Sequence, residues 1–123
     1  MTRDDVNRWL DQYIAAWFDY DATAIGELFT ADAEYRYHPW DDPVRGRNEI
    51  VQDWLNPAGD PTKRDKTGTV DARYECYAVD GDRAVVIGDT DYREVAGGPL
   101  VRRYANVWLI EFEADRRCRS FVE

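Results

Sequence analysis

Residues 100–113 read LVRRYANVWLIEFE, and the alternation in this stretch is the pattern that decides the fold. Successive side chains of a β-strand point to opposite faces of its sheet. One face would carry the even-numbered positions, with Trp108 and Ile110 near its centre, and the other face the odd-numbered positions, with Val107 and Leu109. The stretch therefore predicts a long strand with an apolar centre on both faces.

The same two-residue period extends on either side of this strand. Residues 69–79 and 83–95 precede it, and another alternating segment begins at residue 116. Short turn sequences at 80–82 and 97–99 separate the first three strands, as in β-hairpins. We expect four consecutive antiparallel strands joined as a meander.

The N-terminal half shows helical spacing instead. Apolar residues between positions 6 and 18 recur every three or four residues, with Thr2 and Asp5 placed as an N-cap pair. Asp21 is a candidate cap for a short second helix that carries Leu28 and Phe29. A third helix is expected from Gly46 to Leu55, over residues 46–55.

Two further segments complete the chain. Residues 33–37 are expected to form a short strand before a Pro-rich loop, and residues 56–68 a long polar loop with no apolar face to bury. Three helices followed by a meander predict an α+β fold, with the helices on one face of a curved, mostly antiparallel sheet. At 123 residues the chain has room for a single domain, residues 1–123.

Composition excludes several classes of partner. The formal charge of −9 disfavours nucleic acid and anionic membrane surfaces, and no apolar run is long enough to span a bilayer. Cys76 and Cys118 fit no zinc-binding or redox spacing, and one histidine cannot supply a metal site, so no metal and no cofactor are expected. We expect a reduced, cytoplasmic protein without a secretory signal.

The odd-numbered face of the strand has an apolar centre, which we expect to be buried against another protein surface. A sheet with one face in water would place polar residues at Val107 and Leu109. A second copy of the chain is the simplest cover. The sequence thus predicts a homodimer packed through this face of the sheet.

Four short stretches add a family resemblance: residues 13–14 (YI), 28–33 (LFTADA), 43–47 (PVRGR) and 49–50 (EI). With the order of elements, they resemble the SnoaL-like and ketosteroid-isomerase-like branch of the nuclear transport factor 2-like superfamily, over the whole chain. The resemblance implies a cone-shaped α+β barrel around an apolar cavity, frequent homodimers, and chemistry that differs between members.

Two of three catalytic positions of the ketosteroid isomerases are replaced in this chain. Tyr13 falls where that family has its helix-one tyrosine, but Tyr37 stands at the position of the aspartate base and Trp108 at that of the oxyanion aspartate. The resemblance therefore does not imply steroid isomerisation by that mechanism.

The resemblance to epoxide hydrolases of the limonene type also lacks one catalytic residue. Asp91 matches one catalytic aspartate and Glu123 lies near the second, but Asp89 occupies the position of the arginine between them. In polyketide cyclases of the superfamily a cavity aspartate acts as acid and base, which Asp91 or Asp89 would supply. The resemblance places both aspartates on the cavity face, although a solvent-facing pair neutralised by Arg93 is the alternative.

The candidate catalytic residues are Asp91 and His38 as proton carriers and Tyr13 as donor. A lone histidine in a loop, or a tyrosine on an apolar helix face, is also compatible with a purely structural role. A surplus of aromatic residues predicts a flat apolar ligand. The predicted cavity wall consists of Trp17, Tyr35, Tyr37, Trp40, Trp54, Asp89, Tyr104, Asn106 and Trp108.

Two functions remain open on sequence alone. The first is a cofactor-independent acid/base enzyme, an isomerase, cyclase, dehydratase or hydrolase, acting on a small cyclic or aromatic metabolite. The second is a non-catalytic protein that binds a ligand or serves as a dimeric interaction module.

Overall fold

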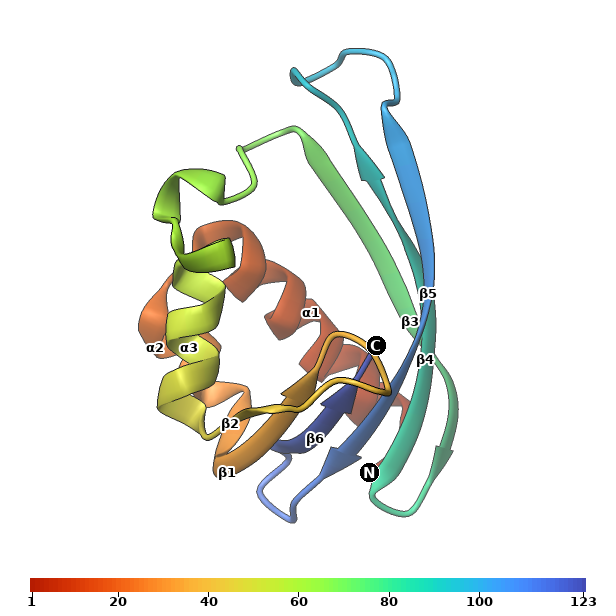
Figure 1. The fold of residues 1–123 in the computed structure, drawn as a ribbon. Coiled ribbons are helices and arrows are strands. Elements are labelled where there is room, and N and C mark those ends of the chain that lie inside the picture. The colour runs from red at the N-terminus through yellow and green to blue at the C-terminus, as the bar shows by residue number, and fades with distance from the viewer.

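The computed structural model describes residues 1–123 as three helices packed against one sheet (Figure 1). The helices are α1 (Arg3–Asp19), α2 (Ala22–Glu27) and α3 (Arg47–Leu55), followed by the short 3-10 turns η1 (Pro57–Gly59) and η2 (Pro61–Lys63). The strands are β1 (Phe29–Arg36), β2 (Val44–Arg45), β3 (Val70–Asp80), β4 (Arg83–Tyr92), β5 (Arg102–Phe112) and β6 (Cys118–Val122).

Helix α1 begins at a capping box, as the sequence predicts. The Asp5 backbone N–H donates to Thr2 Oγ1 at 3.1 Å, and the Thr2 N–H donates to an Asp5 carboxylate oxygen at 3.0 Å. The helix ends where Tyr20 adopts a left-handed conformation with φ 49°. Its buried face consists of Val6, Trp9, Leu10, Tyr13 and Ala16.

Helix α2 is shorter than predicted. Asp21 caps it as expected, but the helix ends at Glu27, and Phe29 starts strand β1 instead of continuing the helix. The carbonyl oxygen of Leu28 accepts hydrogen bonds from Trp9 Nε1 at 3.1 Å and from the Cys118 backbone N–H at 2.8 Å. These tertiary bonds, which local propensity cannot reveal, end the helix here.

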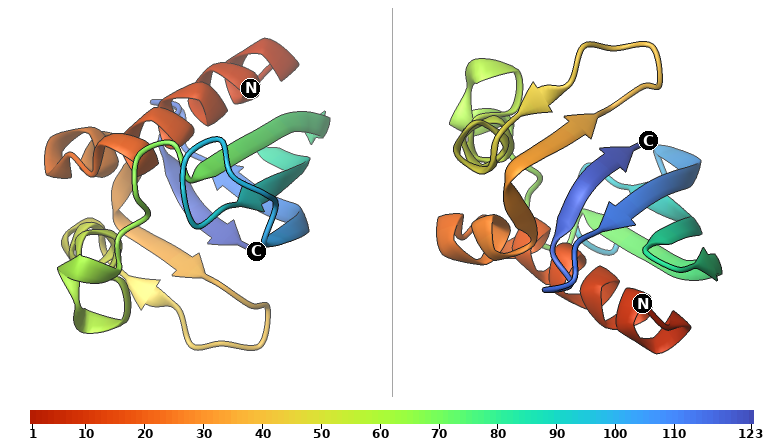
Figure 2. Two further views of the ribbon diagram at one scale, coloured as in Figure 1. Left: turned by 90° about the horizontal axis from the view of Figure 1, so that it is seen from above. Right: turned by 90° about the horizontal axis from the view of Figure 1, so that it is seen from below.

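The six strands form one open sheet in the order β2-β1-β6-β5-β4-β3. Strands β1 and β6 pair in parallel, and all other neighbours are antiparallel. The predicted meander is confirmed as β3 to β6, and so is the α+β fold. The sheet curves around the helices, which all lie on its concave side (Figures 1 and 2). No helix combines the length and the apolar composition that crossing a bilayer requires.

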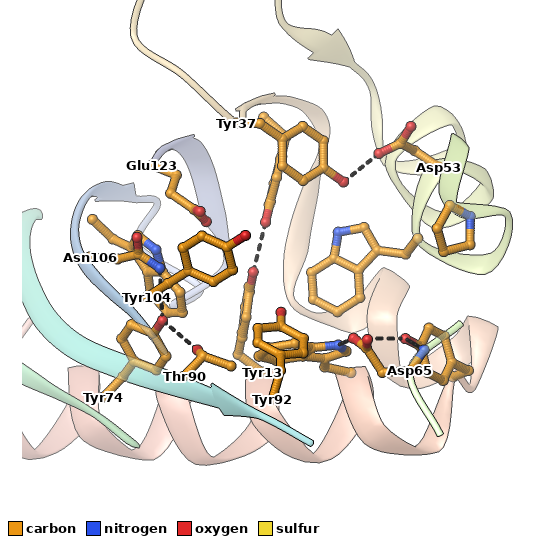
Figure 3. A pocket seen from close by; sticks show the side chains of 16 residues that line it. Tyr13, Tyr37, Asp53, Asp65, Tyr74, Thr90, Tyr92, Tyr104, Asn106 and Glu123 are labelled. Carbon is orange, nitrogen blue, oxygen red and sulfur yellow. Dashed lines mark hydrogen bonds between the residues drawn. The ribbon is translucent and has the colours of Figure 1, made fainter. Parts of the chain in front are cut away.

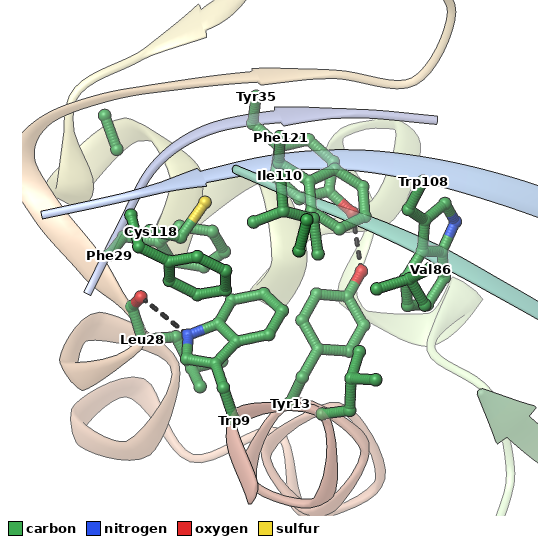
Figure 4. Close-up of a cluster of buried hydrophobic side chains, with 14 of the residues drawn as sticks. Trp9, Tyr13, Leu28, Phe29, Tyr35, Val86, Trp108, Ile110, Cys118 and Phe121 are labelled. Carbon is green, nitrogen blue, oxygen red and sulfur yellow. Dashed lines mark hydrogen bonds between the residues drawn. The ribbon is translucent and has the colours of Figure 1, made fainter. Parts of the chain in front are cut away.

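Aromatic rings dominate the core between the helices and the sheet (Figure 4). The Tyr13 ring lies 5.1 Å from Trp108 and stacks on Phe121 at 5.6 Å. Phe121 also stacks on Tyr35, with 4.4 Å between the ring centroids. Because such pairs have preferred geometries, the cluster holds α1, β1, β5 and β6 in a defined arrangement.

A glycine in β4 makes room for one further ring. A Cβ atom at Gly88 would lie 2.2 Å from the Arg73 carbonyl oxygen and 2.3 Å from the Tyr74 ring, far closer than van der Waals contact. Without that atom, Tyr74 stacks on Trp108 with 3.8 Å between centroids. The close approach of β3 and β4 thus brings Tyr74 to the concave side of the sheet.

Candidate functional site

A cavity of about 320 Å³ lies between the helices and the concave side of the sheet (Figure 3). We call it the aromatic cavity, because ten of the sixteen residues that line it are Tyr or Trp. The lining consists of Tyr13, Trp17, Tyr20, Tyr35, Tyr37, Asp53, Trp54, Pro57, Asp65, Tyr74, Thr90, Tyr92, Tyr104, Asn106, Trp108 and Glu123.

Two buried tyrosines from α1 and β1 meet in the cavity wall. The hydroxyl oxygens of Tyr13 and Tyr35 lie 2.7 Å apart and share a hydrogen bond. Burial raises the pKa of both phenols well above the usual value of 10.0. Both groups are therefore uncharged at neutral pH and retain their protons for hydrogen bonding.

A second hydrogen-bonded group crosses the three central strands. The Tyr74 hydroxyl lies 2.8 Å from Thr90 Oγ1 and accepts a hydrogen bond from Asn106 Nδ2 at 2.9 Å. In the register of the sheet, Tyr74 on β3 and Asn106 on β5 both lie opposite Gly88 of β4, and Thr90 is the diagonal neighbour of each. Asn106, which the sequence predicted as an orienting group, is thereby held in place by Tyr74.

The segment after α3 supplies a wall that sequence reasoning missed. Residues 56–68 were expected to be a polar loop without a buried face, yet Pro57 and Asp65 line the cavity. Trp17 Nε1 donates to the Asp65 carboxylate at 2.9 Å, and the Asp65 backbone N–H donates to the Tyr20 hydroxyl at 2.8 Å. No periodic pattern marks Asp65, because its partners come from α1 and its C-terminal end.

Helix α3 contributes a second carboxylate. The Tyr37 hydroxyl donates to an Asp53 carboxylate oxygen at 2.5 Å, as Figure 3 shows. Burial, with a smaller contribution from Asp53, raises the pKa of Tyr37 far above its ordinary value. Tyr37 is thus a neutral hydrogen-bond donor held by a charge on α3.

Glu123 is the third carboxyl group of the lining. Its backbone N–H donates to the Arg36 carbonyl oxygen at 3.0 Å, which continues the β1–β6 pairing and fixes the residue at the cavity. Burial raises the pKa of the Glu123 side chain, against smaller opposing effects of Trp108 and His38. Sequence reasoning reached Glu123 only through the comparison with epoxide hydrolases.

One buried donor of the cavity has no partner. Trp108 is 2% exposed, and its Nε1–H forms no hydrogen bond. The Glu123 carboxylate lies near enough for this N–H to favour its charged form, but outside hydrogen-bonding geometry. Because an unpaired buried donor is costly, Trp108 is suited to meet an acceptor that enters the cavity.

Most of the residues predicted to line the cavity do so. They are Tyr13, Trp17, Tyr35, Tyr37, Trp54, Tyr104, Asn106 and Trp108.

The predicted placement of Asp89 and Asp91 is wrong. Thr90 and Tyr92 line the cavity, so Asp89 and Asp91, which alternate with them on β4, lie on the convex face. Both faces of β4 carry apolar residues, and only the packing of the neighbouring strands decides which face is covered.

On the convex face, Asp91 forms an ion-pair cluster instead of a catalytic site. Arg103 Nε donates to it at 2.5 Å, and Arg73 donates at 3.0 Å while also pairing with Asp89. The hydrogen bonds from Arg103 and then Arg73 hold the pKa of Asp91 well below its ordinary 3.8. A permanently ionised, doubly paired carboxylate is a poor proton carrier at neutral pH.

His38 and Trp40 also lie outside the cavity lining. His38 Nδ1 lies 2.8 Å from an Asp41 carboxylate oxygen, and its ring stacks on Trp40 at 4.9 Å. Trp40 is 80% exposed. The loop between β1 and β2 therefore carries these side chains at the surface. No group of three or more His, Cys, Asp or Glu side chains is arranged to hold a metal ion.

Comparison with known proteins identifies the family. The profile of the SnoaL-like domain matches residues 10–119. The chain belongs to the SnoaL-like family. No curated protein matches this SnoaL-like chain at a significant level.

Among solved structures, the SnoaL-like chain is similar to a "putative polyketide cyclase" from Sinorhizobium meliloti. The two share 20% sequence identity with a TM-score of 0.65, over 99% of this chain and 98% of the other. At this level of identity, the likeness shows that the two proteins have the same fold.

Proposed function

We propose that the aromatic cavity binds a small, largely apolar or aromatic molecule, and that the protein is a cofactor-independent acid/base enzyme. The reaction would be of the isomerase, cyclase, dehydratase or hydrolase kind. The observation that carries the proposal is the Glu123 carboxyl group on the cavity wall, whose pKa is raised by burial. A carboxyl group whose pKa is raised toward neutral pH is suited to proton transfer under physiological conditions.

The surrounding groups support a role in proton abstraction next to a carbonyl. Glu123 in its ionised form would take a proton from carbon, while the substrate oxygen accepts a hydrogen bond from Trp108 Nε1–H or from the Tyr13–Tyr35 pair. Return of the proton from Glu123 to another carbon completes an isomerisation without a cofactor. Tyr13 thus keeps its proposed role as donor, and Glu123 replaces Asp91 and His38 as proton carrier.

Exchange of carbon-bound protons tests this proposal before the substrate is identified. A panel of cyclic ketones in D2O, followed by NMR, would reveal catalysed exchange at carbons next to the carbonyl. We expect Glu123→Gln to lower the exchange rate at least about a hundredfold. Glu27→Gln is the matched control, because Glu27 is exposed at the end of α2 and lies outside the cavity. Equal exchange by the Glu123→Gln and Glu27→Gln variants would contradict the role of Glu123.

The second candidate is a ligand-binding protein without catalysis. It is favoured by the position of Asp91 and His38 outside the cavity, which leaves fewer groups for acid/base work than the sequence predicted. In that case no ketone would exchange above the background rate, while small aromatic molecules would still quench the fluorescence of Trp17 and Trp54 in the cavity wall.

We also propose that the protein forms a homodimer through the convex face of the sheet. Val107 is 55% and Leu109 52% exposed there, and the register places Val85 and Ile87 beside them. An apolar patch at the centre of a sheet is typical of a protein interface. A cytoplasmic location is part of the same proposal, supported by the two buried free cysteines.

A further inference from the structure

We propose that the ligand of the aromatic cavity carries a positive charge, as a protonated or quaternary amine on an apolar or aromatic body. This inference names the substrate class of the proposed function and rests on it. Three features of the cavity support it: its uncompensated acidic groups, its ring faces, and the placement of the nearest arginines.

The cavity holds negative charge without a counter-charge. Asp53, Asp65 and Glu123 are in the lining, whereas no Lys, Arg or His is. None of these three carboxylates takes part in any ion pair of the structure. Asp91 on the convex face differs from them, because Arg73 and Arg103 both pair with it. A cation in the cavity would therefore meet carboxylates with which no Lys, Arg or His side chain forms an ion pair.

The partners that these carboxylates have are neutral donors. Asp53 accepts from the Tyr37 hydroxyl and Asp65 from Trp17 Nε1, so each is held in position by a donor that carries no charge. A carboxylate fixed by neutral donors keeps acceptor sites free for an ammonium group. These two residues lie on different elements, α3 and the segment that follows η2.

The remaining lining suits the same ligand. Seven tyrosines and three tryptophans line the cavity, and the negative quadrupole of an aromatic ring face attracts ammonium groups. The tyrosines do not add charge of their own, since burial raises the pKa of Tyr13 and Tyr35 well above 10.0 and that of Tyr92 to about 12. A neutral aromatic wall with fixed carboxylates is the usual composition of an ammonium site.

Two arginines outside the lining lie over rings of lining residues. The Arg102 guanidinium carbon lies 4.6 Å from the Tyr92 ring centroid, and that of Arg64 lies 5.3 Å from the Tyr20 ring centroid. Arg64 is held there by donating to the Leu55 carbonyl oxygen at 2.7 Å. These two guanidinium groups show that rings of the cavity residues attract cations from outside, while the lining itself contains no cationic side chain.

A charge-matched pair of probes tests the inference on the intact protein. The cation is 4-(trimethylammoniomethyl)benzyl alcohol, and its neutral isostere is 4-(2,2-dimethylpropyl)benzyl alcohol, which differs only in a carbon atom for the nitrogen. Binding is followed by isothermal titration calorimetry and by tryptophan fluorescence. We expect the cation to bind at least about tenfold more tightly than the isostere.

Two conservative variants assign the preference to the cavity carboxylates. Asp65→Asn and Asp53→Asn should each weaken binding of the cation by roughly three- to tenfold and leave binding of the neutral isostere unchanged. Asp11→Asn is the matched control, since Asp11 is exposed on α1 and outside the cavity. That control should alter neither affinity, and circular dichroism checks that each variant is folded.

The outcomes separate this inference from the proposed function. Equal or tighter binding of the neutral isostere, or cation affinity unchanged in both cavity variants, overturns the charged ligand while leaving an apolar ligand site intact. Absence of binding by either probe to the folded protein overturns the charged ligand, whereas ketone proton exchange that depends on Glu123 would still support the enzyme.

Discussion

Tyr13 and Tyr35 lie 22 positions apart in the sequence, and their hydroxyl oxygens meet at 2.7 Å in a buried hydrogen bond. Either phenol can be the donor, and the rings also stack in turn on Phe121. The pair joins α1 to β1 at the wall of the aromatic cavity. Removing either hydroxyl would leave the other buried without its partner.

The Tyr13–Tyr35 bond should be measurable as a coupling in stability. We expect Tyr13→Phe and Tyr35→Phe each to lower the free energy of unfolding by about 1–2 kcal/mol, because a buried hydroxyl is left unsatisfied. The double variant should lose less than the sum, since no orphan hydroxyl remains. Urea denaturation measures all three, with Tyr104→Phe as control, because Tyr104 is 51% exposed. Strict additivity would contradict the coupling.

Asp91 should give the protein part of its resistance to mild acid. Its pKa is lower in the folded state than the ordinary 3.8, because Arg103 and Arg73 stabilise the carboxylate. This contribution is complete above the unfolded-state pKa and is lost as the pH falls toward the folded-state pKa. The urea midpoint of wild type should therefore drop more steeply between about pH 5 and pH 2 than that of Asp91→Asn.

The exposed Asp11 provides the control for this pH experiment, because it takes part in none of the ion pairs around Asp91. Asp11→Asn should keep the steep wild-type profile. If the urea midpoint of Asp91→Asn fell with pH as steeply as that of wild type, the ion pairs of Asp91 with Arg73 and Arg103 would not contribute to stability between about pH 5 and pH 2.

The convex face should carry the proposed dimer contact. Leu109→Asp places a charge at the centre of the exposed apolar patch, so we expect it to convert a wild-type dimer into a monomer. Sedimentation equilibrium at about micromolar concentration measures the change. Val95→Asp is the control, because Val95 is also an exposed apolar residue but lies in the β4–β5 connection. A monomeric wild type would refute the dimer.

Much of the fold was predictable because its signals are local. Helix α1 has a capping box and a regular apolar face, and the β3–β6 meander has alternating strands separated by turn residues. The two-residue strand β2 was not predicted, since its pairing of Val44 with Tyr35 depends on β1. The end of α2 was misplaced for a similar reason, because bonds to Leu28 from distant residues decide it.

The candidate site was predictable only in part. Aromatic residues such as Trp54 and Trp108 were expected at the cavity and line it. Asp53 and Asp65 were not anticipated, and Glu123 was reached only through the family comparison, because a single carboxylate on a helix, on a strand or in a loop has no distinguishing pattern. Their common position arises from packing between segments that are distant in sequence.

By itself, the sequence determined that β4 is a strand with two alternating faces, that α1 packs one face on a core, and that the chain resembles the SnoaL-like branch. Only the tertiary structure decided that Thr90 lines the cavity while Asp91 lies outside it. Alternation defines two faces but does not say which is covered when both carry apolar residues. The close approach of Tyr74 over Gly88 and the stacking of Tyr74 on Trp108 make that choice.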